Sequence, residues 1–209
     1  MSTPKLLYFD LNGRAGLVRL VLAAAGVAYD DVRFDASAFA GPTATGNTTL
    51  KFADIKATTP YGQLPVLEVN GVHIAQSRAI ERYLAKEHGL FGKDNLEAAL
   101  IDATGEQVRD LAEAFSKGAD AAAKSKFVSE LGSKAASLDA QLAKSHGFLV
   151  GDKLSYADLA FQYAFELFKN ADAAAYDAAV PAALKAHADK IAHLPNVAKY
   201  LAARPVRPF

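Results

Sequence analysis

The chain has 209 residues, of which 51% are hydrophobic, so it can bury one large core or two modest ones. Its formal net charge is zero, so the overall charge does not attract nucleic acid or an anionic membrane surface. The absence of cysteine excludes disulfide scaffolds, cysteine-ligated zinc and catalysis by a thiol of the protein itself. No apolar run is long enough to cross a bilayer and the first residues do not resemble a secretion signal, so we expect a cytoplasmic protein without membrane or nucleic-acid partners.

The first ninety residues alternate predicted strands with predicted helices. KLLYFD, residues 5–10, is typical of a short buried strand, and the apolar spacing after it predicts a helix that ends at Gly26. AYDDVRF, residues 28–34, has the alternation of a second strand. PVLEV and VHIA, joined by Asn70-Gly71, give the strongest hairpin signal in the chain, and a helix closed by Gly89 is expected after them.

The rest of the chain has a different character. Residues 37–50 are rich in small and polar side chains, which predicts a long surface loop. Residues 95–115 and 126–147 carry apolar side chains at the spacing of amphipathic helices. We therefore expect an α/β domain over residues 1–90 and an all-helical domain over residues 91–209.

A capping box marks one helix of the second part. Ser155 and Asp158 have the spacing of this motif, with an acid in place of Glu or Gln, and Leu154 stands where a hydrophobic staple would begin. Large apolar residues then surround much of the helix, so it should be buried.

The stretch around Leu64-Pro65 suggests a ligand site. A proline at the first position of a strand cannot donate a ladder hydrogen bond, and this bond is a candidate cis peptide. Backbone turned outward there could pair with an extended peptide. Gln76-Ser77, at an expected helix start, would offer N–H groups to a carboxylate. One site would then hold a peptide backbone and a carboxylate.

These motifs resemble a known family. YGQLPVLEVNG followed by QSRAIERYL resembles the glutathione-binding signature of cytosolic glutathione transferases, and LLYFDLNGRAGLVRLVLAAAGV resembles the N-terminus of their sigma class. GDKLSYADLAF is similar to the capping-box helix of their helical domain. The resemblance implies a thioredoxin-like α/β N-terminal domain, an all-α C-terminal domain that contributes an electrophile pocket, a cis-proline and a homodimer. It also implies glutathione as co-substrate, without a metal.

The resemblance assigns the catalytic chemistry to Tyr8 and Arg14. A free thiol with a pKa of about 8.5 is only a few per cent thiolate at neutral pH, so a hydrogen bond from the Tyr8 hydroxyl would favour the anion. Arg14 would support the tyrosine and the sulfur, although Gly16 replaces the acidic residue usual in the family. Without the other motifs, Tyr8 is better interpreted as a core tyrosine whose hydroxyl reaches the surface, and Arg14 as a solvated arginine at a helix start.

Phe52 and Lys56 align with a tryptophan and a lysine that sigma-like proteins use around the glycyl end of glutathione. Lysine suits a carboxylate, whereas phenylalanine lacks the indole donor. The alternative for Lys56 is an ordinary surface lysine on a short helix.

The remaining expected contacts follow the two signature motifs. The Leu64 backbone beside Pro65 would pair with the cysteinyl part of glutathione, and Gln63 and Gln76 would bond the ends of the peptide. Ser77 is expected both to cap its helix and to contact the ligand.

Asp110 matches an acidic residue that reaches across the family's dimer to the glutathione ammonium, although a solvated helical aspartate is the alternative. Conjugation of glutathione to hydrophobic electrophiles is the leading interpretation, with peroxidase or isomerase side activity left open. A weakly active structural or ligand-carrying dimer and a prostaglandin-type isomerase are the alternatives. Lys117 stands where the isomerases have an aromatic residue, and residues 36–50 are longer than the family's usual connection.

Overall fold

The computed structural model describes residues 3–37 and 48–207. Most of the expected surface loop therefore lies outside the described residues. The chain forms two compact units, one of Met1–Leu84 with Lys199–Phe209 and the other of Ala85–Ala198.

The first unit is built on a four-stranded sheet in the order β2-β1-β3-β4. The strands are β1 (Lys5–Phe9), β2 (Asp30–Phe34), β3 (Val66–Val69) and β4 (Val72–Ala75). β1 pairs in parallel with β2 and antiparallel with β3, and β3 pairs antiparallel with β4. The expected mixed α/β arrangement of the first part is therefore confirmed.

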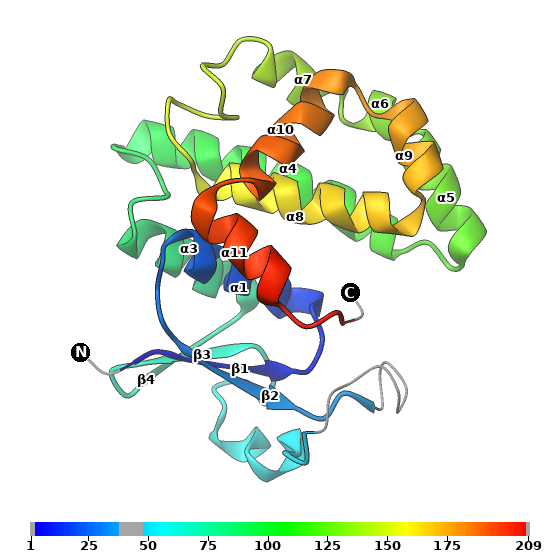
Figure 1. Cartoon of the computed structure of the whole chain (residues 1–209). Coiled ribbons are helices and arrows are strands. Elements are labelled where there is room, and N and C mark those ends of the chain that lie inside the picture. Colours follow the sequence, from blue (N-terminus) through cyan, green and yellow to red (C-terminus); the bar gives the residue numbers. More distant parts are fainter. Residues whose placement is uncertain (1–2, 38–47, 208–209) are drawn as a thin grey trace. The chain divides into compact units, whose positions relative to one another are not determined.

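Helices cover this sheet on both sides. α1 (Gly16–Ala24) follows the 3₁₀ turn η1 (Gly13–Ala15), and it lies with α3 (Ser77–Glu87) on one face of the sheet (Figure 1). The short turns η2 (Phe52–Asp54) and η3 (Lys56–Thr58) lie on the other face.

Local turn chemistry explains where these elements end. Asn70 and Gly71 have φ angles of 50° and 80°, the left-handed values that a two-residue type I′ hairpin requires, so the predicted hairpin is confirmed. Gly26 has a φ of 68° just past α1, as predicted for its C-terminal glycine. The Leu64-Pro65 bond is cis, as expected.

The regular structure of the second unit is all helical in its described residues, as predicted. Its helices are α4 (Asn95–Ser116), α5 (Ala121–Ser129), α6 (Leu131–Lys134), α7 (Ala136–Leu142), α8 (Tyr156–Ala171), α9 (Ala173–Ala179) and α10 (Ala182–Ala192), while α11 (Pro195–Ala203) runs from this unit into the C-terminal part of the first. The segment 126–147, which the sequence predicts as amphipathic helix, is divided among the three short helices α5, α6 and α7 and ends in turns after Leu142. The chain leaves helical geometry at Glu130 and Ala135, where ψ is 1° and 10°.

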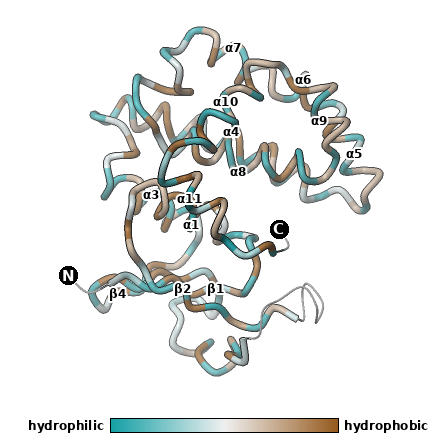
Figure 2. Tube along the Cα trace, in the orientation of Figure 1, coloured by the Kyte–Doolittle hydropathy of each residue, from teal (hydrophilic) through white to brown (hydrophobic). Residues whose placement is uncertain are grey.

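Helix α8 is the centre of the second unit. It packs against α4, α5, α9 and α10, and Phe161 and Phe165 stack within it with ring centroids 3.8 Å apart. The capping box of Ser155 and Asp158 is present, as predicted. Figure 2 shows hydrophobic and hydrophilic residues alternating along the surrounding helices, as expected for helices with one buried face. None of the helices in the described residues is both long and apolar enough to span a membrane.

Candidate functional site

Strand register brings three of the expected site residues into one row. Leu7 pairs with Val66, and Val66 pairs with Ala75. Tyr8 follows Leu7, Pro65 precedes Val66 and Gln76 follows Ala75, so all three residues lie at this end of the sheet. The end of the sheet therefore unites residues from three separate parts of the chain.

The Tyr8 hydroxyl has a defined partner. The main-chain N–H of Arg14 donates a hydrogen bond to the phenolic oxygen at 3.0 Å, and Tyr8 is only 6% exposed. Because the oxygen accepts this bond, the phenolic proton remains available for a second acceptor. Gly13 precedes the donor with a φ of 36°. The contact that joins Arg14 to Tyr8 runs through the backbone rather than the guanidinium, which sequence reasoning did not anticipate.

A buried arginine lies against Tyr8. Arg19 has no exposed surface, and its guanidinium carbon is 5.9 Å from the centroid of the Tyr8 ring. Its Nη1 donates to the Leu11 carbonyl at 2.7 Å, and its Nε and Nη2 bind the Asp31 carboxylate at 3.1–3.2 Å. Sequence reasoning missed this residue. The available signal was an arginine within the apolar run of α1.

Asp10, directly after β1, extends this charge network. It is 2% exposed and accepts hydrogen bonds from Arg33 at 2.8 Å and Arg207 at 3.0 Å. Burial opposes the charge of Arg33, but hydrogen bonding to Asp10 and the charge of Asp31 outweigh it, so the Arg33 pKa is raised. This network was also not predicted from the sequence, because no local pattern links residues so far apart in the chain.

The backbone before β3 offers groups for a peptide ligand. Within the described residues, neither the N–H nor the C=O of Leu64 makes a hydrogen bond. The exposed side chain of Lys56 runs along the chain just before Gln63, because a Cβ placed on Gly62 would lie 3.5 Å from the Lys56 Cε. An ammonium group and free backbone groups therefore occur on neighbouring segments, which suits a peptide with a terminal carboxylate.

The start of α3 differs in detail from the expectation. The Gln76 carbonyl accepts the first helical hydrogen bond, from the Ile80 N–H at 3.0 Å. Gln76 therefore holds the cap position, and Ser77 is the first residue of the helix, so the predicted capping role of Ser77 is wrong. Gln76 has a φ of 72°, a left-handed conformation that is strained for a residue with a side chain and is often found at binding sites.

The other two expected binding residues have different surroundings. Phe52 packs against Phe9 and Phe34, with ring centroids 5.6 and 6.4 Å apart, so its described contacts are aromatic. Asp110 is exposed on α4 in the second unit. It follows Leu96 and Leu100 at helical spacing on one face of that helix.

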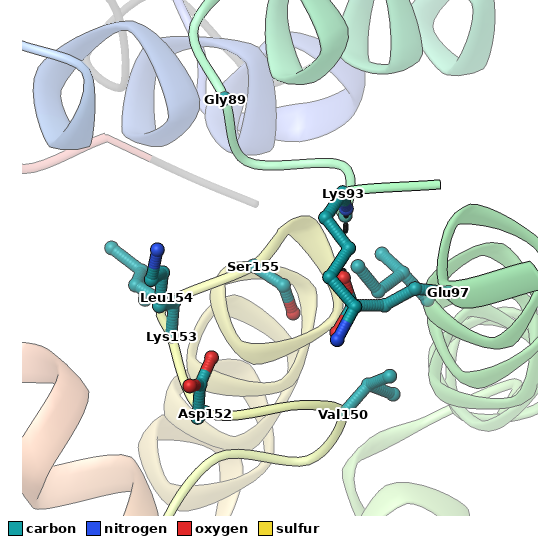
Figure 3. A pocket seen from close by; sticks show the side chains of 10 residues that line it. Gly89, Lys93, Glu97, Val150, Asp152, Lys153, Leu154 and Ser155 are labelled. Atoms are coloured by element: carbon teal, nitrogen blue, oxygen red, sulfur yellow. Dashed lines mark hydrogen bonds between the residues drawn. The ribbon is translucent and has the colours of Figure 1, made fainter. Parts of the chain in front are cut away.

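A cavity in the second unit does not belong to this row of residues. It has a volume of about 250 Å³, below the usual range for small-molecule sites, and Lys93 projects into it (Figure 3). Its lining combines two lysines with Glu97 and Asp152, so it has no net preference for an anion. Elsewhere in the described residues, no group of three or more His, Cys, Asp or Glu side chains is arranged to hold a metal ion.

Comparisons with known proteins agree on one family. Residues 4–86 match the model for the glutathione S-transferase N-terminal domain, and residues 108–204 match a model for the C-terminal domain. A probable glutathione S-transferase 9 of Caenorhabditis elegans is 38% identical over 220 residues, covering 99% of this chain and 98% of that protein. The structure of a monomeric glutathione S-transferase from the hookworm Necator americanus superposes with a TM-score of 0.80 at 30% identity, covering all of both chains. A prostaglandin synthase D of Nilaparvata lugens gives a TM-score of 0.76 at 30% identity, covering 98% of this chain and 100% of that one.

Proposed function

The chain belongs to the glutathione S-transferase family, and we propose that it activates the thiol of glutathione as a thiolate for attack on hydrophobic electrophiles. The observation that carries this proposal is the Tyr8 hydroxyl, which accepts from the Arg14 N–H and keeps its own proton for donation. Family membership supplies glutathione as co-substrate, and the chain has no cysteine of its own to act as the nucleophile.

Tyr8 would act by donating a hydrogen bond to the sulfur. A hydrogen bond to the charged form of a group favours that form, so the thiol would lose its proton at a lower pH than the usual value of about 8.5. The guanidinium of Arg19 against the Tyr8 ring adds positive charge, which further favours an anion. Tyr8 is thus the catalytic residue of the proposal, and Arg14 supports it.

Glutathione would lie along the end of the sheet. The free Leu64 backbone beside Pro65 suits the cysteinyl peptide groups, and Lys56 with Gln63 suits the glycyl carboxylate. Gln76 and Ser77, at the start of α3, suit the carboxylate of the γ-glutamyl end.

Phe52 would contribute apolar contact near the glycyl end, without the hydrogen bond of a tryptophan. Its packing against Phe9 and Phe34 supports a role in fixing the shape of that side of the site.

We also propose a homodimer in which Asp110 of one copy binds the glutathione ammonium of the other. Leu96 and Leu100 are 72% and 52% exposed on the same face of α4 as Asp110, and such exposed apolar side chains suit a protein interface. The hookworm relative is described as monomeric, so the dimer needs its own test.

A second candidate is a prostaglandin-type isomerase, which is favoured by the likeness to the Nilaparvata lugens prostaglandin synthase D. Lys117 counts against it, because a charged residue follows α4 where the sequence resemblance expects an aromatic side chain. On the basis of the sequence motifs, we propose that the chain is a sigma-like, cytoplasmic detoxifying enzyme. The isomerase is the second candidate.

The proposal is tested by calorimetric titration of glutathione and of an S-alkyl glutathione, together with conjugation to an aryl halide followed by absorbance. We expect both ligands to bind and only glutathione to form product. Lys56→Ala should weaken binding of both ligands about tenfold, whereas Lys144→Ala, at an exposed lysine of the second unit, should not. Binding without turnover of the halide would favour the carrier or the isomerase, and conversion of a prostaglandin endoperoxide would identify the latter.

A further inference from the structure

The C-terminal tail is tied to the loop that follows β1. Arg207 Nε donates to the Asp10 carboxylate at 3.0 Å, and Asn12 Nδ2 donates to the Arg207 carbonyl at 3.0 Å. Asp10 and Asn12 are only 2% and 7% exposed, so water competes little for these bonds. The tail therefore holds the loop through a side chain and through its backbone.

That same loop ends at the partner of the Tyr8 hydroxyl. It runs from Asp10 to Arg14, whose N–H donates to Tyr8. Arg19 fixes the loop at the Leu11 carbonyl. The conformation of the loop decides whether the Arg14 N–H points at the phenolic oxygen, because the backbone between these anchors is continuous and short.

Removing the tail contact would also change the charge around Asp10. Two carboxylates, Asp10 and Asp31, face three guanidinium groups, Arg19, Arg33 and Arg207. Without Arg207, the buried Asp10 carboxylate would lose one of its two ion pairs and keep the one with Arg33, which Asp31 also binds.

We propose that Arg207 is a positioning residue, which ties the C-terminal tail to the loop of residues 10–14 and thereby holds the Arg14 N–H against Tyr8. This inference rests on the proposed function of Tyr8, and it assigns a role in the chemistry to a residue near the end of the chain. Arg207 touches no reacting atom and acts only through Asp10 and Asn12.

Four variants separate this role from a general effect. Arg207→Ala removes the ion pair, and Asn12→Ala removes the bond to the tail backbone without changing any charge. Arg207→Lys keeps the positive charge on the tail. Lys199→Ala, at an exposed lysine of α11, removes one positive charge from the same end of the chain. Each is measured for kcat/KM of aryl halide conjugation against pH, and for hydrogen exchange of the amides of residues 10–16.

We expect Arg207→Ala and Asn12→Ala each to lower kcat/KM roughly fivefold, to move its pH profile to higher pH and to speed exchange in residues 10–16. Arg207→Lys should recover most of the loss, and Lys199→Ala should match the native chain. If both alanine variants behave like Lys199→Ala, the positioning role is overturned.

The two proposals can fail separately. If the native chain does not turn over any aryl halide, the conjugation proposal fails. The role of Arg207 in holding the loop of residues 10–14 is then tested by hydrogen exchange alone. Faster exchange of residues 10–16 in both alanine variants would then still support it, and unchanged exchange would overturn it.

Discussion

A Cβ placed on Gly13 would lie 2.7 Å from the hydroxyl oxygen of Tyr8. Real Cβ atoms do not approach another heavy atom so closely, and Gly13 also has a φ of 36°, which a residue with a side chain adopts at a cost. The absence of a side chain at Gly13 therefore provides the space that the proposed catalytic hydroxyl of Tyr8 occupies.

Gly13→Ala should displace the Tyr8 hydroxyl and lower kcat/KM for aryl halide conjugation by at least about tenfold. Gly71→Ala is the matched control, because Gly71 has a φ of 80° but nothing lies within 4 Å of its added Cβ. The control should lose about 1 kcal/mol of stability and keep its activity. Equal activity of the two variants would contradict the close approach.

Whether the sequence predicts a structural feature depends on how far apart in the chain its interacting residues lie. The Asn70-Gly71 hairpin and the Ser155 and Asp158 capping box were predicted, because a few neighbouring residues determine them. The choice of Tyr8, Pro65 and Gln76 as site residues came from the family resemblance, whereas their position at one end of the sheet was not predicted. Gln76 as the helix cap was not predicted, since a positive φ at glutamine has no compositional signal.

Contacts between residues far apart in the chain are the main features that the sequence patterns did not predict. The hydrogen bond between Arg207 and Asp10 joins positions 197 residues apart, and no periodicity in the sequence predicts it. The break of the 126–147 segment into three helices was missed for a similar reason. Gly132 packs so closely on the Ala179 carbonyl that a Cβ there would lie 2.4 Å from that oxygen, so tertiary packing shapes this region.

Gly105 allows α4 to approach α8 closely. A Cβ there would lie 2.6 Å from Cε1 of Tyr156, whose ring is fully buried and whose hydroxyl accepts from Arg109 Nε at 3.2 Å. Helix propensity alone predicts that Gly105→Ala stabilises the protein by about 1 kcal/mol. We expect instead a loss of about 1–3 kcal/mol from overpacking, measured by urea unfolding. A gain in stability would show that the helices adjust without cost.

Tyr176, on α9, makes stability sensitive to alkaline pH. Burial, with a smaller effect of Asp189 and Asp177, raises the pKa of its phenol to about 12. The folded state thus holds this proton more tightly than the unfolded state, whose pKa is about 10. The stabilisation is complete below pH ~10 and is lost as pH rises towards 12.

Urea unfolding between pH 9 and 11.5 tests this expectation. Tyr176→Phe should remove about 2 kcal/mol of the decline in unfolding free energy over this pH range. Tyr61→Phe, at a tyrosine that is 67% exposed, should leave the decline unchanged. A Tyr176→Phe profile identical to the native one would refute the assignment.

The proposed dimer predicts a coupling between the exposed face of α4 and glutathione binding. Leu100→Glu should give monomers in sedimentation analysis, and it should weaken glutathione binding by about the same tenfold as Asp110→Ala. The double variant should bind no more weakly than either single one. Ala136→Glu adds the same charge at an exposed position of α7 and should change neither property. Additive losses, or a native chain that is monomeric, would remove Asp110 from the site.

The role of Tyr8 is tested most directly by the pH dependence of kcat/KM for aryl halide conjugation in the native chain and in Tyr8→Phe, with glutathione affinity measured for both. If Tyr8 has this role, the native profile rises with an apparent pKa well below the ordinary thiol value of about 8.5. Tyr8→Phe then binds glutathione within about threefold of the native chain, while its profile returns towards that value. A Tyr8→Phe variant that keeps the native profile and rate would contradict it.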